Sequence, residues 1–449
     1  MTAATDRTTR APASWRRIDR AAGGLALDLG LYAASAAFAA VTAATSTLPA
    51  HRAWGTVAAF GYLLAALAVA GQLAARHRLR PADRPGSPHR DAAAPLAGLP
   101  ARWAVTGLAW AGATLLPLLL QSAQRAAGRT DRAQEEVVVV EHSGNRLVET
   151  GTPYLGHDAI AALPADERLL GYTPYQPGMA LFGLPRAVTD GWWTDARVWF
   201  AVATALLLAL AVRALRPTAP TAASGPVGTG DRSAAVLRGV QAATVLPVCA
   251  LTLATGGDDL PVLAGCLLAL ALAASGRPGL AGLAIGAAGA LKLFAWPVAL
   301  VLIAWAATRR SAGRLAVGAL GVPALALLPA LLVDRDALVE NVLRYPLGHG
   351  LVTSPAQSPF PGHLIATGLP AGRVIAAALL VAAGAAIAVR LLRRPPRTAT
   401  ATALICGYGL LAAILLMPTT RFGYLLYPAA LLAWAPALTH PAPGPSTTP

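Results

Sequence analysis

Long apolar runs, separated by shorter polar segments, recur along the whole chain of 449 residues. Most of these runs have the length of about 20 residues that a helix needs to cross a hydrocarbon core of ~30 Å. We therefore expect an all-α integral membrane protein, a bundle of about twelve transmembrane helices with two long extracytoplasmic loops. The expected spans are 23–46, 53–75, 101–121, 193–214, 236–254, 260–276, 279–293, 296–308, 313–333, 371–390, 398–417 and 422–438.

Three of these spans, at 260–276, 279–293 and 296–308, are short for a membrane helix. Short spans are tolerated where they are tilted, broken or buried against protein. The Ala/Gly-rich stretch 279–291 predicts close packing against a neighbouring helix, because small side chains let two backbones approach.

The placement of arginine predicts how the spans are oriented. Clusters of arginine follow every second span, so alternating spans put all of them on one side of the membrane. Because cytoplasmic loops are enriched in Lys and Arg, that side is the cytoplasm, and both termini are cytoplasmic. The first apolar run has no clear cleavage site, and we expect a retained span in a multi-pass plasma-membrane protein.

The same pattern predicts the domain organisation. We expect a basic cytoplasmic tail (1–22), two N-terminal spans with a basic cytoplasmic loop (23–100), a main membrane domain (101–438) and a disordered C-terminal tail (439–449). Within the third part we expect outer loops at 122–192 and 334–370. A cytoplasmic linker rich in Pro, Gly, Ser and Thr is expected at 215–235.

The composition agrees with a membrane protein and excludes other classes. Only 13% of the residues are charged, whereas a soluble domain has about 25%. The net charge of +15 would favour nucleic acid as a partner of a soluble protein, but these arginines end apolar runs, so we expect no nucleic-acid partner. The three cysteines lie inside apolar runs, which predicts neither a disulfide framework nor a metal site.

Acidic residues gather on the side opposite the arginines, where 14 of the 21 lie, so we expect the chemistry at the outer face. The first outer loop contains a segment at 134–149 that reads as a short helix or strand. One of the carboxylates in or just before it can act as a general base toward a hydroxyl, although most such carboxylates form a solvated face; they are Asp131, Glu135, Glu136, Glu141 and Glu149. The stretch TPYQPGMALFGLP (173–185) reads as an interfacial segment resting on lipid.

Two charged groups lie close to the ends of the short spans. Asp258 and Asp259 sit in a turn before a span, where they either cap a helix or bind a cation or a sugar hydroxyl. Lys292, the only lysine of the chain, falls at the outer end of a short span, near the aspartate pair. It is either a functional charge or a lysine that snorkels to the interface.

The second outer loop and the last span add further candidates. Arg344, His349 and His363 lie in or beside a proline-rich loop and can contact a phosphate, and the spacing of the histidines does not indicate zinc. Arg421 and Tyr424 stand at the outer mouth of the last span. They form either an anion clamp or an aromatic-belt anchor with an interfacial arginine.

Several of these motifs together resemble the GT-C class of polytopic glycosyltransferases, most closely family 87, over roughly residues 100–438. EEVVVVEHSGNRLVETGTPY is similar to the family's first outer loop, and Glu136 falls where the family carries an aspartate. GGDDLPVLAGCLLALALAASGRPGLAGLAIGAAGALKLFAWP resembles the family's polar turn, span and small-residue helix that ends in Lys-x-x-x-x-Pro. Val140 departs from the family, which commonly has an aromatic residue there, and the two N-terminal spans are additional.

The resemblance implies a hexosyltransferase that moves a sugar, mannose in characterised members, from a polyprenyl-phosphate donor to a lipid or glycan acceptor at the outer face, with inversion. A carboxylate is the expected general base, Glu136 first and Asp131 or Asp258 next. The expected substrate and phosphate ligands are Asp259, Lys292, Arg344, His349, His363, Arg421 and Tyr424. The expected partners are donor, acceptor and membrane lipids. No cofactor is expected, and a divalent cation is not indicated.

Two other classes remain open at this level. A transporter or flippase has a similar number of spans, although transporters commonly show two related halves and midplane charges that this chain lacks. A non-catalytic membrane assembly factor is the third alternative.

Overall fold

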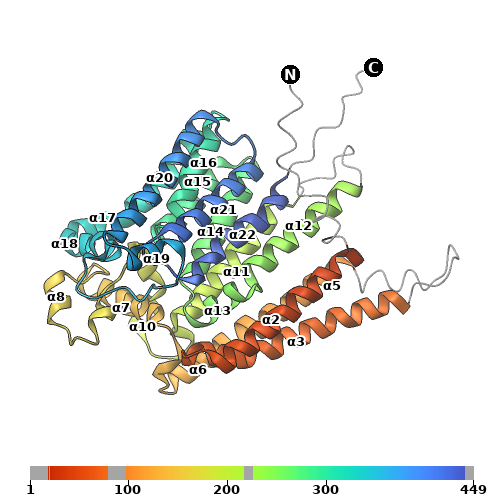
Figure 1. The fold of residues 1–449 in the computed structure, drawn as a ribbon, viewed down its shortest axis with the longest axis horizontal. Helices are drawn as coiled ribbons and strands as arrows, with labels where there is room; N and C mark the ends of the chain where they lie inside the picture. The colour runs from red at the N-terminus through yellow and green to blue at the C-terminus, as the bar shows by residue number, and fades with distance from the viewer. Residues whose placement is uncertain (1–18, 20, 79–97, 217–225, 440–449) are drawn as a thin grey trace. The chain divides into compact units, whose positions relative to one another are not determined.

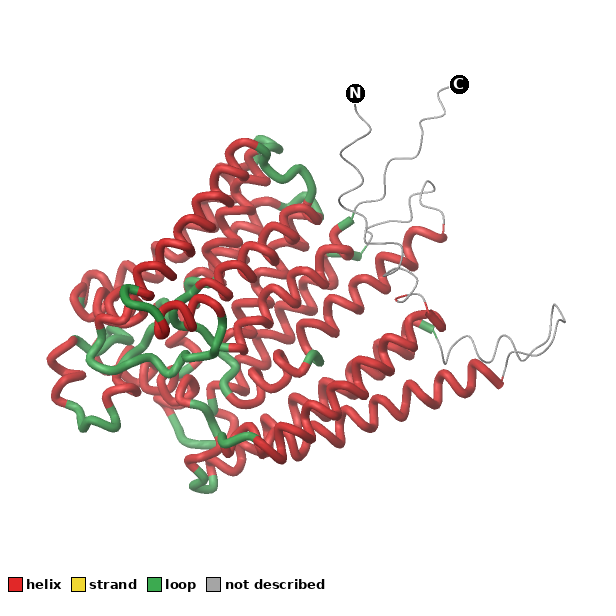
Figure 2. The backbone as a smooth tube through the Cα atoms, in the orientation of Figure 1, coloured by secondary structure: helices red, strands yellow, loops and turns green. Residues whose placement is uncertain are grey.

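The computed structural model describes residues 19, 21–78, 98–216 and 226–439 (Figure 1). These residues are almost entirely helix and loop, as Figure 2 shows, and their only β-type pairing is an isolated bridge between Gln357 and Thr420. Most of the two expected tails (1–18, 20 and 440–449), much of the expected basic loop (79–97) and the linker segment 217–225 lie outside the described residues. The contacts divide the chain into one unit of Met1–Gln121 and Thr244–Thr255 and a second of Ser122–Ala243 and Gly256–Pro449.

The first unit holds the N-terminal helices. Its elements are η1 (Ala21–Gly24), α2 (Leu25–Thr45), α3 (Pro49–Arg78), α5 (Leu99–Trp110), the π-helical turn η2 (Ala111–Leu115), most of α6 (Leu116–Ala126) and α13 (Pro247–Thr255). A buried ion pair joins Arg102 Nε to Asp28 Oδ2 at 2.7 Å. Because both charges are buried, their mutual neutralisation ties α2 to α5 within the apolar unit.

The second unit holds the remaining apolar helices. They are α11 (Ala196–Ala214), α12 (Pro226–Thr244), α14 (Asp259–Ala274), α15 (Pro278–Leu291), α16 (Ala295–Ala307), α17 (Ala312–Val333), α20 (Gly372–Arg393), α21 (Ala399–Leu416), η7 (Phe422–Leu425), α22 (Leu426–Trp434) and η8 (Ala435–Leu438). Every residue of α14 is buried, and this helix contacts α11, α15, α16, α21 and α22. A short helix can be this apolar all round because its neighbours, and not lipid, cover it.

The close crossing of α15 and α17 depends on glycine. A Cβ added at Gly282 or Gly286 would collide with the carbonyl oxygens of Leu315 or Gly318 on α17. The two backbones therefore touch directly, which confirms the packing predicted for 279–291.

Gly286→Ala should lower the free energy of unfolding by about 1–3 kcal/mol, because the new methyl group meets a backbone oxygen that cannot move aside. Gly279→Ala, on the same helix, is the matched control. A Cβ there meets no atom within 4 Å, so this change should be neutral or slightly stabilising. Thermal unfolding in detergent measures both variants, and equal effects would contradict the close crossing.

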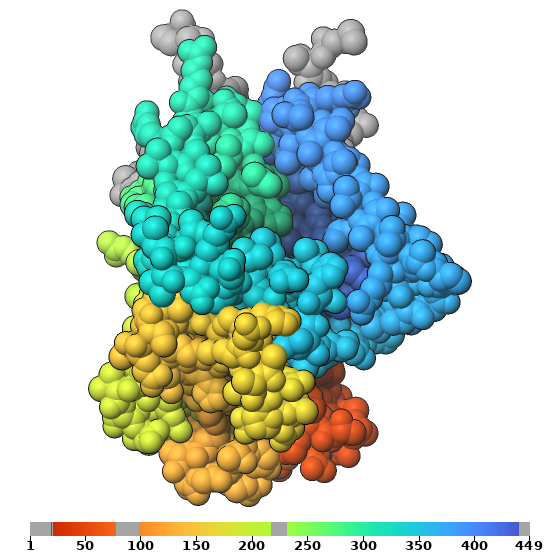
Figure 3. Space-filling model, turned by 90° about the vertical axis from the view of Figure 1, so that its left-hand side faces the viewer, coloured from red at the N-terminus to blue at the C-terminus, as the bar shows by residue number. Residues whose placement is uncertain are grey.

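The segments between the apolar helices form a second group of elements. They are η3 (Thr130–Arg132), α7 (Glu135–Thr150), α8 (His157–Ala162), α9 (Arg168–Gly171), η4 (Pro177–Phe182), α10 (Leu184–Val188), η5 (Trp192–Thr194), α18 (Arg335–Val339), the π-helical η6 (Glu340–His349) and α19 (Pro361–Gly368). Figure 3 shows that the first expected outer loop, in orange and yellow, lies beside the second, in cyan. The contact includes the hydrogen bond from Tyr172 to Glu340.

All twelve expected apolar segments coincide with helices, but the number of spans is not confirmed. Seven of the described helices are long and apolar enough to cross a membrane, or eight if the bent pair Asp231–Thr244 and Pro247–Thr255 is one span. Four shorter apolar helices, Asp259–Ala274, Pro278–Leu291, Ala295–Ala307 and Phe422–Leu438, fall below that length. Part of the expected linker is helical, since α12 begins at Pro226.

Candidate active site

The centre of the candidate site is the junction of α14, α15 and α16. α15 ends at Leu291, Lys292 is extended, and α16 begins at Ala295. Pro297 lies in the first turn of α16, where its missing N–H costs nothing. If α15 continued through Lys292 without a break, the ring of Pro297 would clash with the preceding helical turn. The sequence therefore breaks the helix at the residue that carries the charge.

Lys292 is bound by both aspartates of the polar turn. Its Nζ lies 2.9 Å from Asp258 Oδ2 and 2.7 Å from Asp259 Oδ1. All three side chains are buried, with Lys292 only 7% exposed, so this lysine does not snorkel to an interface. Asp258 occupies the N-cap position of α14, but its side chain makes no capping hydrogen bond. Its carboxylate is directed to the lysine instead.

Aromatic side chains enclose this ion cluster. The hydroxyl of Tyr427 donates to Asp259 Oδ1 at 2.7 Å, and the Lys292 Nζ lies 5.3 Å and 5.5 Å from the ring centres of Tyr175 and Tyr424. The ring of Phe294 stacks on that of Tyr427. The hydroxyl stabilises the carboxylate that it binds, and the two ring faces stabilise the ammonium, so these charged groups are supported although they are removed from water.

The first of the two expected outer loops (122–192) reaches this cluster through the segment 175–178. The Gln176 N–H donates to the carbonyl of Leu291 at 3.1 Å. A Cβ at Gly178 would stand 2.6 Å from the carbonyl oxygen of Ala290. Tyr175 and Met179 are buried. The interfacial interpretation of 173–185 is therefore wrong for this part of the segment, which packs on protein because glycine permits the close approach.

A second charged group lies at the N-terminus of α7. Glu136 in its first turn forms an ion pair with Arg421. Their side chains are 15% and 30% exposed, so water and ligands can reach this pair, unlike the lysine cluster. Arg421 and Tyr424 are three residues apart at the start of the last apolar segment. Residues 421–427 therefore contact both charged groups.

The second expected outer loop (334–370) positions Arg421. The Thr420 N–H donates to Ala356 O at 3.0 Å, and the Ser358 N–H donates to Thr420 O at 2.9 Å. His363 Nδ1 lies 3.0 Å from the carbonyl oxygen of Pro418. In the structure His363 thus supports the turn that precedes Arg421.

The remaining predicted residues lie apart from these two groups. Asp131 is paired with Arg129 and Arg132 on the surface. Arg344 is 60% exposed and lies 3.5 Å from Glu340 one turn earlier on η6. His349 is exposed near the end of η6.

Sequence reasoning missed a buried group around Glu340. Its Oε1 accepts a hydrogen bond from the Tyr172 hydroxyl at 2.9 Å, and the Tyr172 ring stacks on Tyr345 with centres 4.2 Å apart. Burial raises the pKa of Tyr345 to about 12, and the charge of Glu135 adds to the shift. The carboxylate of Glu135, in the first turn of α7, is therefore close enough to Tyr345 to act on it electrostatically. Only the apolar residues around Glu340 in DALVENVLRY indicate that it could be buried.

A third, purely structural group also escaped prediction. Arg125 donates to Glu141 Oε2 at 2.8 Å and to Asp195 Oδ2 at 2.6 Å, and Arg197 donates to Asp195 at 2.7 Å. Burial opposes ionisation of Asp195, but the two guanidinium groups outweigh it and hold the pKa of that carboxyl well below its usual range. Its contribution to stability is therefore present above the unfolded pKa of about 3.9 and is lost only as the pH falls through the lower folded pKa.

Asp195→Asn should lower the free energy of unfolding at neutral pH by about 3–5 kcal/mol, because two buried guanidinium groups lose a shared counter-charge. Asp190→Asn is the matched control: its side chain is 89% exposed and pairs with Arg186, and such a pair contributes at most about 1 kcal/mol. Thermal unfolding at pH 7 separates the two variants. Equal small losses would show that the network does not stabilise the fold.

The fold and the site define a class: a multi-pass membrane protein with buried and partly exposed charged groups where its apolar helices meet polar segments. The sequence model of glycosyltransferase family 87 matches residues 172–419, more than half of the chain, and the chain belongs to this family. It is a membrane glycosyltransferase, which confirms the family inferred from the motifs. The match includes Asp258, Asp259 and Lys292, whereas Glu136 and Arg421 lie outside it. Comparisons with curated proteins and with solved structures found no significant match.

Proposed function

We propose that this enzyme transfers a hexose, mannose in the first instance, from a polyprenyl-phosphate donor to a lipid or glycan acceptor at the extracytoplasmic face, with inversion. The observation that supports this most is the accessible Glu136–Arg421 pair beside the buried lysine cluster, in a chain of family 87. The carboxylate of Glu136 is suited to accept a proton, and the guanidinium of Arg421 is suited to bind a phosphate.

In this proposal the guanidinium of Arg421 binds the donor phosphate, and the carboxylate of Glu136 is the general base. The acceptor hydroxyl oxygen forms a bond to the anomeric carbon while the bond from that carbon to the phosphate oxygen breaks. The hydroxyl proton passes to Glu136, and polyprenyl phosphate leaves with the bonding electrons. The ion pair holds the Glu136 carboxylate beside the guanidinium that binds the phosphate.

The buried cluster takes a different role in the proposal. The ammonium of Lys292 already donates to two carboxylates, so we assign the donor phosphate to Arg421 and not to the lysine. Lys292, Asp258 and Asp259 then fix the ends of α14 and α15 beneath the reacting groups. Asp131 is the weaker candidate base, because two arginines bind it on the surface.

The activity is tested with the purified protein in lipid nanodiscs, supplied with polyprenyl-phosphate mannose and a lipid or glycan acceptor. We expect transfer of the sugar, with a product whose anomeric configuration, read by NMR, is opposite to that of the donor. Passage of the intact donor across the membrane without transfer would favour the alternative, a transporter or flippase.

The proposed orientation, with both termini cytoplasmic in the plasma membrane, predicts a labelling pattern. Asp166→Cys, in the first outer loop, should react with an impermeant maleimide added to intact cells, and Arg309→Cys, in the turn before α17, should not. The native Cys249, Cys266 and Cys406 are buried and give a low background. Labelling of the second variant alone would reverse the orientation and move the proposed chemistry to the cytoplasm.

A further inference from the structure

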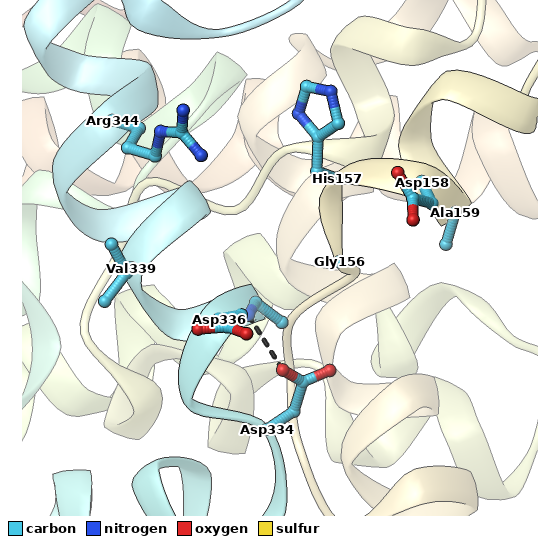
Figure 4. Close-up of a pocket in the computed structure, with 9 residues that line it drawn as sticks. Gly156, His157, Asp158, Ala159, Asp334, Asp336, Val339 and Arg344 are labelled. Atoms are coloured by element: carbon cyan, nitrogen blue, oxygen red, sulfur yellow. Dashed lines mark hydrogen bonds between the residues drawn. The ribbon is translucent and has the colours of Figure 1, made fainter.

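A polar cleft lies beside the Glu340 group, between the start of α8 and the junction of α17 with α18 (Figure 4). Its volume is about 600 Å³, within the range of about 300–1,000 Å³ that is usual for small-molecule sites. The residues that line it are Gly156, His157, Asp158, Ala159, Asp334, Asp336, Ala337, Val339 and Arg344.

The lining offers both hydrogen-bond acceptors and hydrogen-bond donors. Asp158 and Asp336 are exposed, and Figure 4 shows Arg344 and His157 on the side away from Asp334. Asp334 uses Oδ1 to accept the Ala337 N–H at 2.8 Å at the start of α18. The carboxylates outnumber the guanidinium group, so the cleft repels a phosphate. The polar lining does not suit a lipid chain either.

A buried carboxylate stands behind this lining. Glu340 is 1% exposed, and its Oε1 lies 3.3 Å from Nδ1 of His157. Its Oε2 has no hydrogen-bond partner among the described residues, and its closest charged neighbour is Arg344 at 3.5 Å. A buried oxygen without a hydrogen bond is costly even beside a cation, so a group that donates to Oε2, directly or through a reoriented Arg344, stabilises the site.

We propose that this cleft binds the hydroxyl groups of a carbohydrate, as a subsite for the glycan acceptor; its role as an acceptor subsite rests on the proposed function. A sugar hydroxyl both donates and accepts, which matches a lining of carboxylates, imidazole and guanidinium. A metal ion fits less well, because no group of three or more His, Cys, Asp or Glu in the described residues is arranged to hold one. Tyr172, which donates to Glu340, stacks on Tyr345, so aromatic rings support the buried carboxylate behind the cleft.

Ligand-observed NMR titrations of the full-length protein in nanodiscs test the binding without any donor. The probes are disaccharides of mannose, glucose and galactose. We expect at least one to bind the wild type, and Asp158→Asn combined with Asp336→Asn to weaken it by about tenfold or more, because charge-assisted hydrogen bonds are lost. Ala159→Phe, which fills the cleft without changing its charge, should weaken binding equally.

Asp166→Asn, an exposed carboxylate outside the cleft, is the matched control and should bind as the wild type does. The proposal is overturned if no disaccharide binds the wild type, or if the cleft variants bind as tightly as the control. Glu136→Gln separates the two proposals, since it should slow transfer by about 10²–10⁴-fold and leave disaccharide binding intact. Disaccharide binding that depends on the cleft, in a wild-type protein that transfers no sugar from polyprenyl phosphate, would support the cleft and refute the proposed function.

Discussion

Glu136→Gln is expected to reduce the rate of sugar transfer by about 10²–10⁴-fold, while the affinity for the polyprenyl-phosphate donor stays the same or improves. The amide cannot accept the acceptor proton, and general-base catalysis contributes an effect of this size. The amide also releases Arg421 from its ion pair, so the guanidinium is free to bind phosphate. Measurement of kcat and of donor KM under single-turnover and steady-state conditions separates the two effects.

The chain offers two comparisons for this variant. Glu149→Gln changes an exposed carboxylate at the other end of α7 and should keep the wild-type rate. Glu135→Gln changes the neighbouring carboxylate. If Glu135→Gln loses the activity and Glu136→Gln keeps it, the base is the residue near Tyr345 and our assignment is off by one position. Glu136→Asp should retain part of the rate, because a carboxylate remains within the same turn.

The apolar pattern predicted where the helices lie, because each helix is a long apolar run and such runs recur along the chain. It could not fix the number of spans, because helices such as α14 are shorter than a bilayer core and are covered by protein. Length alone does not distinguish a short span from a buried helix. The α7 segment was ambiguous for another reason. Four consecutive valines favour a strand, but Val137, Val139 and Val140 are buried within a helix, so tertiary packing overrides local preference.

The contact between Lys292 and the aspartate pair could be anticipated from the sequence. For the Glu136–Arg421 pair and the Glu340 group, the sequence predicted at most the side of the membrane. Asp258 and Lys292 are 34 residues apart, at the two ends of a helical hairpin whose short link brings those ends together. Tyr172 and Glu340 are 168 residues apart in different loops, and no periodicity relates them. Glu136 and Arg421 were both expected at the outer face, but their contact depends on how the second outer loop holds the turn at 420.

Lys292→Met is expected to lower the free energy of unfolding by about 3–5 kcal/mol and to abolish transfer. Methionine fills much of the space of the lysine stem but leaves two carboxylates buried beside each other without a cation. Arg277→Met is the matched control, since it removes an exposed cation at the opposite end of the α14–α15 hairpin and should change stability by less than about 1 kcal/mol. Thermal and denaturant unfolding in detergent measure both.

Substitution of both aspartates by asparagine, in the Lys292→Met background, distinguishes an electrostatic role of the cluster from a role in packing alone. If the cost of Lys292→Met arises from unpaired charge, the triple variant with Asp258→Asn and Asp259→Asn should regain most of the stability, since all three buried groups are then neutral. If lysine is needed only for its shape, the asparagine substitutions should add their own losses. Restored stability without restored transfer would show that the cluster's charge serves catalysis as well as the fold. Restored stability together with restored transfer would show that the lysine and the aspartates only support the ends of α14 and α15.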